Sequence, residues 1–150
     1  MIELAHHTFT VERSYPQSPA KVFRAHADAA AKRRWFAEST GFVIDSYSLD
    51  FKVGGWERTR FRYGEDGPPM TNDCVYHEIA ENERMVFSYA MTIGGAPLSV
   101  SLSTTELFPE GTGTRLVFTE QIVHYGEQDI EGRKDGTRQL FERLAAELNG

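Results

Sequence analysis

Apolar and polar residues alternate along most of the chain, in short segments separated by glycine and proline. Such alternation is typical of half-buried β-strands, whose side chains point to opposite faces at every second residue. It predicts strands over residues 8–15, 42–51, 56–63, 72–79, 84–93, 98–108 and 114–125. Because turns rich in Gly and Pro separate the later strands at regular intervals, we expect an antiparallel meander.

Helical patterns flank this run of strands. Ser18 followed by Pro19 is typical of a helix N-terminus, and Asp28 is placed to cap a second short helix over residues 29–36. Near the end of the chain, mostly apolar residues recur at helical spacing over residues 131–148: Thr137, Leu140, Phe141, Leu144, Ala145 and Leu148. This spacing predicts a long amphipathic helix.

The first half of the long helix contains Gly132 and Gly136, one turn apart. Each costs about 1 kcal/mol relative to alanine in a helix. A frayed helix start would explain them. Alternatively, the apolar second half packs on the sheet and the glycine half leaves room beside it.

The order of these elements predicts an α+β domain over residues 1–150, because the strands and helices are segregated along the chain. We expect a helix-grip arrangement, in which a curved antiparallel sheet of about seven strands wraps around the C-terminal helix. Two short helices follow the first strand. A length of 150 residues is enough for one such core.

The composition restricts the classes of function and the cellular locations that we expect. The net charge of −6 argues against non-specific nucleic-acid binding, which needs a basic surface, although it leaves a local basic patch open, and we expect no nucleic-acid partner. Cys74 is the single cysteine, so no intrachain disulfide forms and a reducing, cytoplasmic location is expected. No signal peptide is recognised, and no segment reaches the roughly 18 apolar residues of a membrane span.

The motifs for metals and cofactors are incomplete. His77-Glu78 begins like a zinc-protease motif, but Glu81 stands where the second histidine is required, and the segment is a predicted strand. Gly111-Thr112-Gly113 lacks the third glycine of a dinucleotide loop and is a hairpin turn. We therefore expect neither a metal nor a cofactor.

Several segments together resemble a known superfamily: residues 19–25 (PAKVFRA), 34–36 (RWF), 50–56 (DFKVGGW), 76–79 (YHEI), 83–87 (ERMVF) and 113–116 (GTRL). Their order and spacing resemble the START/Bet v-like (SRPBCC) superfamily. The nearer likeness is to bacterial homologues of the activator of the ninety-kilodalton heat-shock chaperone ATPase. That family often has Gly-Trp near the start of the last helix, whereas here Gly136 precedes Thr137. The missing indole would enlarge or open any cavity there.

The resemblance implies a cavity between sheet and helix for a small hydrophobic or amphipathic molecule. It also implies that Trp35 and Trp56 anchor the cavity entrance, although both would serve equally as core residues. A chaperone is the alternative partner, and the edges of such a sheet would allow a homodimer. Relatives include lipid carriers, hormone receptors and aromatic cyclases, so the fold alone leaves the function open.

Alternation assigns faces to three strands. Leu116, Phe118, Glu120, Ile122 and His124 share one face, so Glu120 points inward if Leu116 and Phe118 face the helix. A buried carboxylate needs partners and would orient a ligand or act as a base; at the sheet rim it would meet water or an arginine.

Residues 84–93 place Met85, Phe87, Tyr89, Met91 and Ile93 on one face, as core or as an adaptable pocket wall.

The arginines of residues 56–63 share a face with Trp56: Arg58, Arg60 and Arg62. They would suit an acidic partner, but alternation favours a solvated convex face, with Phe61 and Tyr63 towards the cavity.

The predicted function is therefore ligand binding, with the cavity lined by Trp35, Phe61, Tyr89, Leu116, Phe118, Glu120, Thr137 and Phe141. No residue is assigned as catalytic. Two alternatives stay open. One is a protein-interaction module that stimulates a chaperone ATPase. The other is an enzyme of cyclase, dehydrase or hydrolase type that uses Glu120 with Tyr89 or His124.

Overall fold

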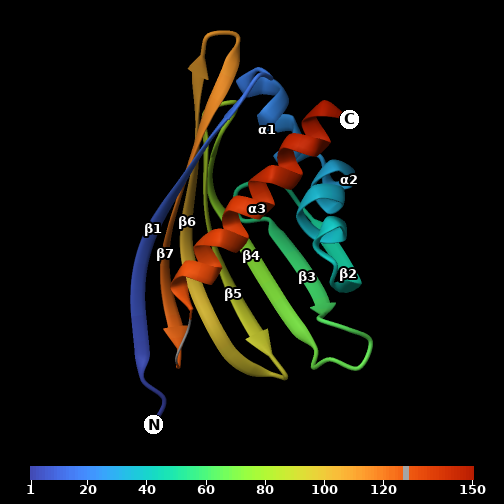
Figure 1. Cartoon of the computed structure of the whole chain (residues 1–150), viewed down its shortest axis with the longest axis vertical. Helices are drawn as coiled ribbons and strands as arrows, with labels where there is room; N and C mark the ends of the chain where they lie inside the picture. The colour runs from blue at the N-terminus through green and yellow to red at the C-terminus, as the bar shows by residue number, and fades with distance from the viewer. Residues whose placement is uncertain (127–128) are drawn as a thin grey trace.

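The computed structural model describes residues 1–126 and 129–150. Seven antiparallel strands form one sheet in the order β1-β7-β6-β5-β4-β3-β2 (Figure 1). They are β1 Leu4–Tyr15, β2 Val43–Leu49, β3 Trp56–Arg62, β4 Met70–Ala80, β5 Arg84–Ile93, β6 Ala96–Glu110 and β7 Gly113–Tyr125. The predicted α+β helix-grip fold is confirmed, with the first strand paired to the last.

Two short helices follow β1, as the sequence predicts. In α1, Pro19–Ala27, the Ser18 hydroxyl accepts a hydrogen bond from the Lys21 backbone N–H. Asp28 caps α2, Ala29–Lys32. The predicted continuation to residue 36 is wrong, because the chain widens into a π-helical turn, η1 Arg33–Ala37, and a 3₁₀ turn, η2 Glu38–Thr40. The wider turn buries both Trp35 and Ala37.

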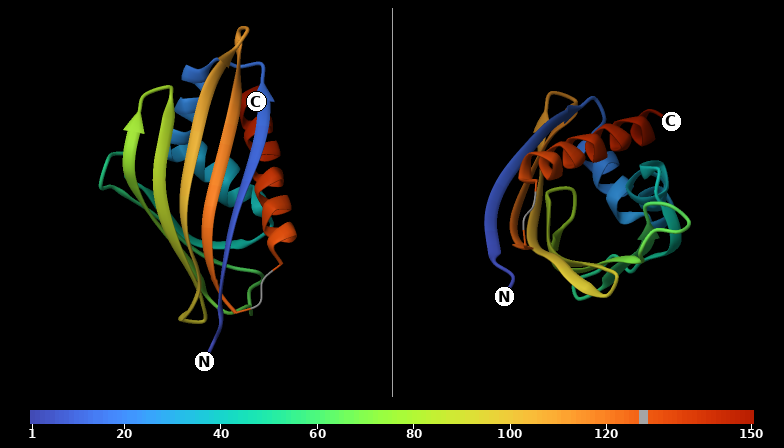
Figure 2. Two further views of the ribbon diagram at one scale, coloured as in Figure 1. Left: turned by 90° about the vertical axis from the view of Figure 1, so that its left-hand side faces the viewer. Right: turned by 60° about the horizontal axis from the view of Figure 1, so that its bottom comes forward.

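The long helix α3, Ile130–Asn149, lies along the open side of the curved sheet (Figure 2). Its second half packs into the core through Phe141, Leu144 and Leu148. The Tyr15 hydroxyl of β1 also donates a hydrogen bond of 2.9 Å to the Phe141 carbonyl. These contacts hold the second half of α3 against the sheet. In the described part of the chain, no helix is long and apolar enough to cross a membrane.

Candidate functional site

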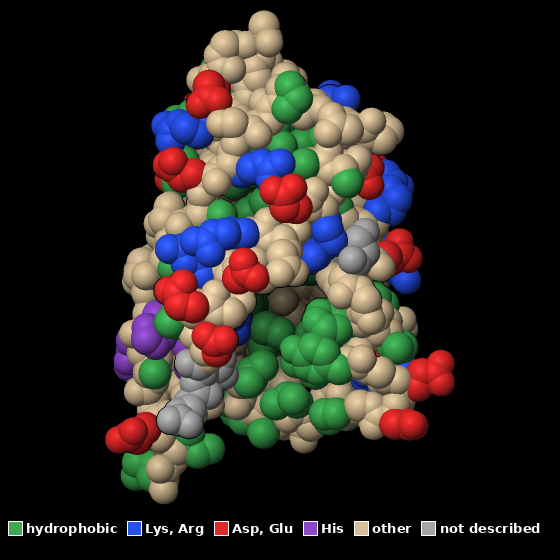
Figure 3. Space-filling view, in the orientation of Figure 1, with side chains coloured by type: hydrophobic (Ala, Val, Ile, Leu, Met, Phe, Trp, Pro, Cys, Tyr) green, Lys and Arg blue, Asp and Glu red, His purple; other side chains and the backbone are tan. Residues whose placement is uncertain are grey.

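The first half of α3 lies over a cavity of about 620 Å³. Gly132, Gly136 and Thr137 border the cavity on the helix side. A Cβ atom added to Gly136 would have no neighbour within 4 Å. Figure 3 shows a hollow in this face, below α3, where hydrophobic side chains gather. The glycine half of the helix therefore does leave room beside it.

Seven of the eight residues predicted to line a cavity do so: Trp35, Phe61, Tyr89, Phe118, Glu120, Thr137 and Phe141. Leu116 is the exception, because it is fully buried in the hydrophobic core. It lies early in β7, opposite Leu107 of β6, and does not border the cavity. Whether the other seven contact a ligand stays a prediction.

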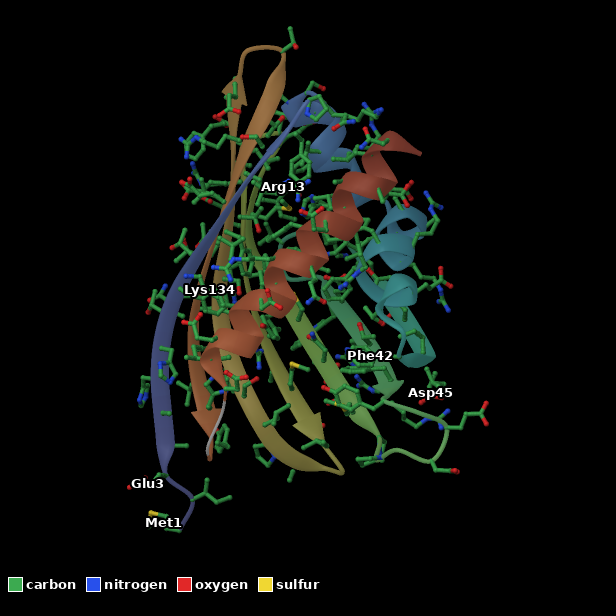
Figure 4. The ribbon with its side chains drawn as sticks, in the orientation of Figure 1. Met1, Glu3, Arg13, Phe42, Asp45 and Lys134 are labelled. Carbon is green, nitrogen blue, oxygen red and sulfur yellow. The ribbon has the colours of Figure 1, made fainter. Side chains whose placement is uncertain are left out.

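The cavity wall is mostly apolar. The inward stripe of β5 contributes all five of its predicted members: Met85, Phe87, Tyr89, Met91 and Ile93. Trp35 is held in place by its indole N–H, which donates to the Ala25 carbonyl at 2.9 Å. Phe42 lines the other side of the cavity and is labelled beside the lower end of β3 in Figure 4.

The outer face of β3 carries the arginines that alternation assigned to solvent. Arg60 pairs with Asp73 at 2.8 Å, and Arg62 pairs with Asp45 at 2.8 Å. Trp56 lies on this outer face too, 44% exposed, with Arg58 stacked on its ring. Its expected position at the cavity entrance is wrong, because Trp56 alternates with the inward-facing Glu57.

Glu120 is the centre of one polar cluster at the cavity wall. Only 2% of the residue is exposed, and its carboxylate accepts hydrogen bonds from Tyr89 at 2.7 Å and Ser101 at 3.1 Å. Arg133 of α3 pairs with it at 3.6 Å and donates to the Tyr89 hydroxyl at 2.9 Å. Glu120 therefore points inward, as expected for a buried carboxylate. Its partner is an arginine, which was expected for a carboxylate at the sheet rim. Burial and the charge of Glu120 raise the pKa of Tyr89, so this phenol is a hydrogen-bond donor at neutral pH.

A second polar cluster surrounds Glu57, which is 3% exposed and also borders the cavity. The Lys32 ammonium lies 3.2 Å from both carboxylate oxygens. Tyr47 donates a hydrogen bond of 2.5 Å to Glu57, and Tyr76 donates one of 2.8 Å. Burial, as the largest cause, raises the pKa of both phenols, which keeps them protonated as donors.

Lys32, Glu57 and Arg133 border the cavity but are not among the predicted site residues. For Glu57 a signal existed, since it lies on the same strand face as the inward-facing Phe61. Lys32 lies in a helix of four residues, too short for a periodic pattern. Arg133 meets Glu120 only through the tertiary fold, which brings α3 over β7.

Two buried histidines and the single cysteine lie near these clusters in neutral forms. Burial lowers the pKa of His26 to about 3, with the Lys32 charge adding to the effect. Burial, then Arg133 and His7, also lower the pKa of His124. Burial raises the pKa of the Cys74 thiol to about 12. Among the described residues, no group of three or more His, Cys, Asp or Glu side chains could hold a metal ion.

A curved antiparallel sheet that encloses an apolar cavity together with a C-terminal helix defines the helix-grip, SRPBCC-type class of proteins. Within that class, the chain belongs to the family described as activator of Hsp90 ATPase homolog 1-like protein, whose model matches residues 16–149. The resemblance found in the sequence is therefore confirmed.

Solved structures of bacterial proteins are similar over nearly the whole chain. The Mll3558 protein of Rhizobium loti has 49% identity and a TM-score of 0.89, covering 97% of this chain and 99% of that one. A protein of Rhizobium leguminosarum has 35% identity and a TM-score of 0.93, covering 99% and 98%. CV1439 of Chromobacterium violaceum has 25% identity and a TM-score of 0.79, covering 95% and 97%. Comparison with curated proteins found no match.

Proposed function

We propose that the protein binds a small hydrophobic or amphipathic molecule between the sheet and the first half of α3. The observation that carries this proposal is the apolar cavity of about 620 Å³ beside Gly132 and Gly136. Sites for small molecules commonly enclose about 300–1,000 Å³ and combine apolar walls with a few polar groups. The two polar clusters around Glu57 and Glu120 are such groups.

The glycines in the first half of α3 support the interpretation that the cavity has a function. Protein interiors are normally packed as densely as organic crystals, so a space of this size is unusual. Gly136 lies inside the helix and costs about 1 kcal/mol relative to alanine, although a Cβ there would meet no atom within 4 Å. Gly132 also has a local role, because a Cβ there would lie 2.5 Å from the capping carboxylate of Asp129. Both glycines border the cavity, where a larger side chain would reduce its volume.

The two alternatives receive less support. A chaperone-stimulating role is suggested by the family description, but it would use the outer surface and leave the cavity without a purpose. An enzyme that uses Glu120 as a base needs a carboxylate free to accept a proton from substrate. The Glu120 oxygens are instead engaged by Tyr89, Ser101 and Arg133. This arrangement favours binding over proton transfer.

A cavity-filling substitution tests the proposal. In Thr137→Trp an indole replaces a half-buried side chain at the cavity border, whereas Arg138→Trp places the same indole on the exposed face of α3. The probe is 4′-ethylbiphenyl-4-carboxylate, titrated by calorimetry. We expect binding to the wild type and to Arg138→Trp, and a loss of about tenfold or more in affinity for Thr137→Trp. Equal binding to all three proteins would contradict a site in the cavity, and no binding to any would contradict the proposal itself.

A further inference from the structure

The polar clusters around Glu57 and Glu120 indicate which chemical groups a ligand would carry at its two ends. Building on the proposed function, we propose that the ligand has an apolar body with an oxygen acceptor at each end. Lys32 binds one acceptor and Arg133 binds the other. Glu57 and Glu120 then act as counter-ions that hold these cations in place, and they do not contact the ligand as its main partners.

Both clusters lie on the inner face of the curved sheet, on strands that are well separated in the sheet order. Glu57 belongs to β3 and Glu120 to β7, and three strands separate them in the sheet order. Four strand spacings correspond to about 19 Å along the sheet, and curvature shortens the path through the cavity. Between them the wall is mostly apolar, with Met70 of β4 and Phe87 of β5, although Asn72 and Thr105 also border the cavity. A ligand that reaches both clusters therefore needs an apolar middle.

At the β3 side, the carboxylate is saturated and the ammonium is not. Glu57 accepts hydrogen bonds from Lys32, Tyr47 and Tyr76, which occupy both of its oxygens. The Lys32 ammonium has three N–H donors, yet in the described part of the chain Glu57 is the one acceptor that it contacts. The ammonium also lies over two aromatic rings, 4.7 Å from the centre of Phe36 and 5.5 Å from that of Trp35. The remaining N–H donors of Lys32 can therefore donate hydrogen bonds to an acceptor of the ligand.

At the β7 side, the carboxylate of Glu120 is likewise occupied, while Arg133 keeps N–H donors without a partner among the described residues. Its Nε faces Glu120, and its Nη2 donates to Tyr89 and approaches the Met91 sulfur at 3.6 Å. Nη1 has no partner among residues 1–126 and 129–150. A guanidinium stays charged in proteins, so its open N–H groups are permanent donors at the cavity wall.

The charge balance differs between the two ends. Arg143 also borders the cavity, donates to the Trp35 carbonyl at 3.2 Å and has no ion pair among the described residues. The Lys32 ammonium lies 5.5 Å from the centre of the Trp35 ring, so both cations approach the same tryptophan. Cations therefore outnumber carboxylates at the Lys32 end, which suits an anionic carboxylate. At the other end Arg133 pairs with Glu120, and the exposed Asp129 also borders the cavity, so no excess positive charge remains there and a neutral carbonyl suits that end better than an anion. An amine in place of the carboxylate fits the Lys32 end poorly, because it would meet a saturated carboxylate and a cation.

A matched series of probes tests this assignment on the wild-type protein. In 4′-acetylbiphenyl-4-carboxylate both ends carry an acceptor. The ethyl analogue, 4′-ethylbiphenyl-4-carboxylate, lacks the far acceptor, and the aminomethyl analogue, 4-acetyl-4′-(aminomethyl)biphenyl, replaces the carboxylate with a cation. By calorimetry we expect the acetyl carboxylate to bind about tenfold more tightly than either analogue, as charged hydrogen bonds in a dry site imply.

Two double variants assign the ends while removing charges in pairs, so that no buried charge is left alone. In Arg133→Met with Glu120→Gln, we expect the ratio of acetyl to ethyl affinities to fall to about one. In Lys32→Met with Glu57→Gln, the preference for the carboxylate over the aminomethyl compound should disappear. Circular dichroism verifies folding, and if a variant fails to fold, the wild-type series still decides.

The outcomes separate this inference from the function on which it rests. If the ethyl and acetyl carboxylates both bind, with affinities within about twofold, the recognition of two acceptors is wrong and the cavity function stands. Tight binding of the aminomethyl compound would also overturn the inference. If none of the three compounds binds, the proposed function fails together with the inference.

Discussion

Lys32→Met is expected to destabilise the protein far more than a typical lysine substitution. Methionine retains most of the apolar stem of lysine but removes the ammonium that lies 3.2 Å from both oxygens of Glu57. The side chains of the pair are 7% and 4% exposed, so solvent cannot replace the lost cation. Tyr47 and Tyr76 would remain as the donors to a buried negative charge.

Removing one partner of a buried ion pair typically costs about 3–5 kcal/mol in the free energy of unfolding. For a chain of 150 residues, each kcal/mol shifts the melting temperature by about 2–4 °C, so the expected decrease is about 6–20 °C. The double variant Lys32→Met with Glu57→Gln should recover about half of this loss, because both charges leave together. The assay is urea unfolding followed by circular dichroism, with calorimetry for the melting temperature.

The matched control is Lys21→Met on the exposed face of α1, for which we expect a change within about 0.5 kcal/mol. If Lys32→Met is no more destabilising than this control, the ammonium is solvated and the pairing with Glu57 has no structural importance. In that case the assignment of Lys32 to the ligand site would lose its basis too.

Other predictions address the surroundings of the cavity. The pKa of His26 falls from 6.5 to about 3 in the folded state, so below pH 6.5 the unfolded chain binds the extra proton. The free energy of unfolding should therefore decrease as pH falls through this window, by up to about 1.4 kcal/mol per pH unit, and His26→Asn should flatten that slope in urea unfolding. Gly136→Ala should stabilise the protein by about 1 kcal/mol, because its Cβ enters open space. Gly113→Ala should destabilise it by about 1–3 kcal/mol, because its Cβ would lie 2.2 Å from the Tyr15 carbonyl oxygen; melting temperatures check both. Tyr15→Phe removes the hydrogen bond to Phe141 and should cost about 1 kcal/mol in urea unfolding.

The fold could be predicted from the sequence because one buried face imposes strict alternation on each strand. In β7, Phe118, Glu120 and Ile122 are buried, while Val117 and Thr119 are half-buried and Gln121 is exposed. The cap at Ser18 is equally local, since it depends on two adjacent residues. The π-helical turn at Arg33–Ala37 could not be predicted, because it forms where Trp35 packs in the core, and this packing depends on distant segments.

The apolar part of the cavity was predictable for the same reason, but its polar part was not. Tyr89 and Glu120 lie on faces that alternation assigns correctly. Their partner Arg133 comes from α3, so the cluster exists only when the helix lies over the sheet. Lys32 and Glu57 likewise belong to different elements and meet through the tertiary fold.

Native mass spectrometry of the freshly purified protein tests directly whether the cavity holds a small molecule. We expect a species heavier than the 17.0 kDa chain, and extraction under denaturing conditions should release a compound with an apolar body. The same compound, added back, should raise the melting temperature of the wild type and not that of Thr137→Trp. A protein that carries nothing, and whose melting temperature no lipid or aromatic carboxylate raises, would contradict ligand binding in the cavity.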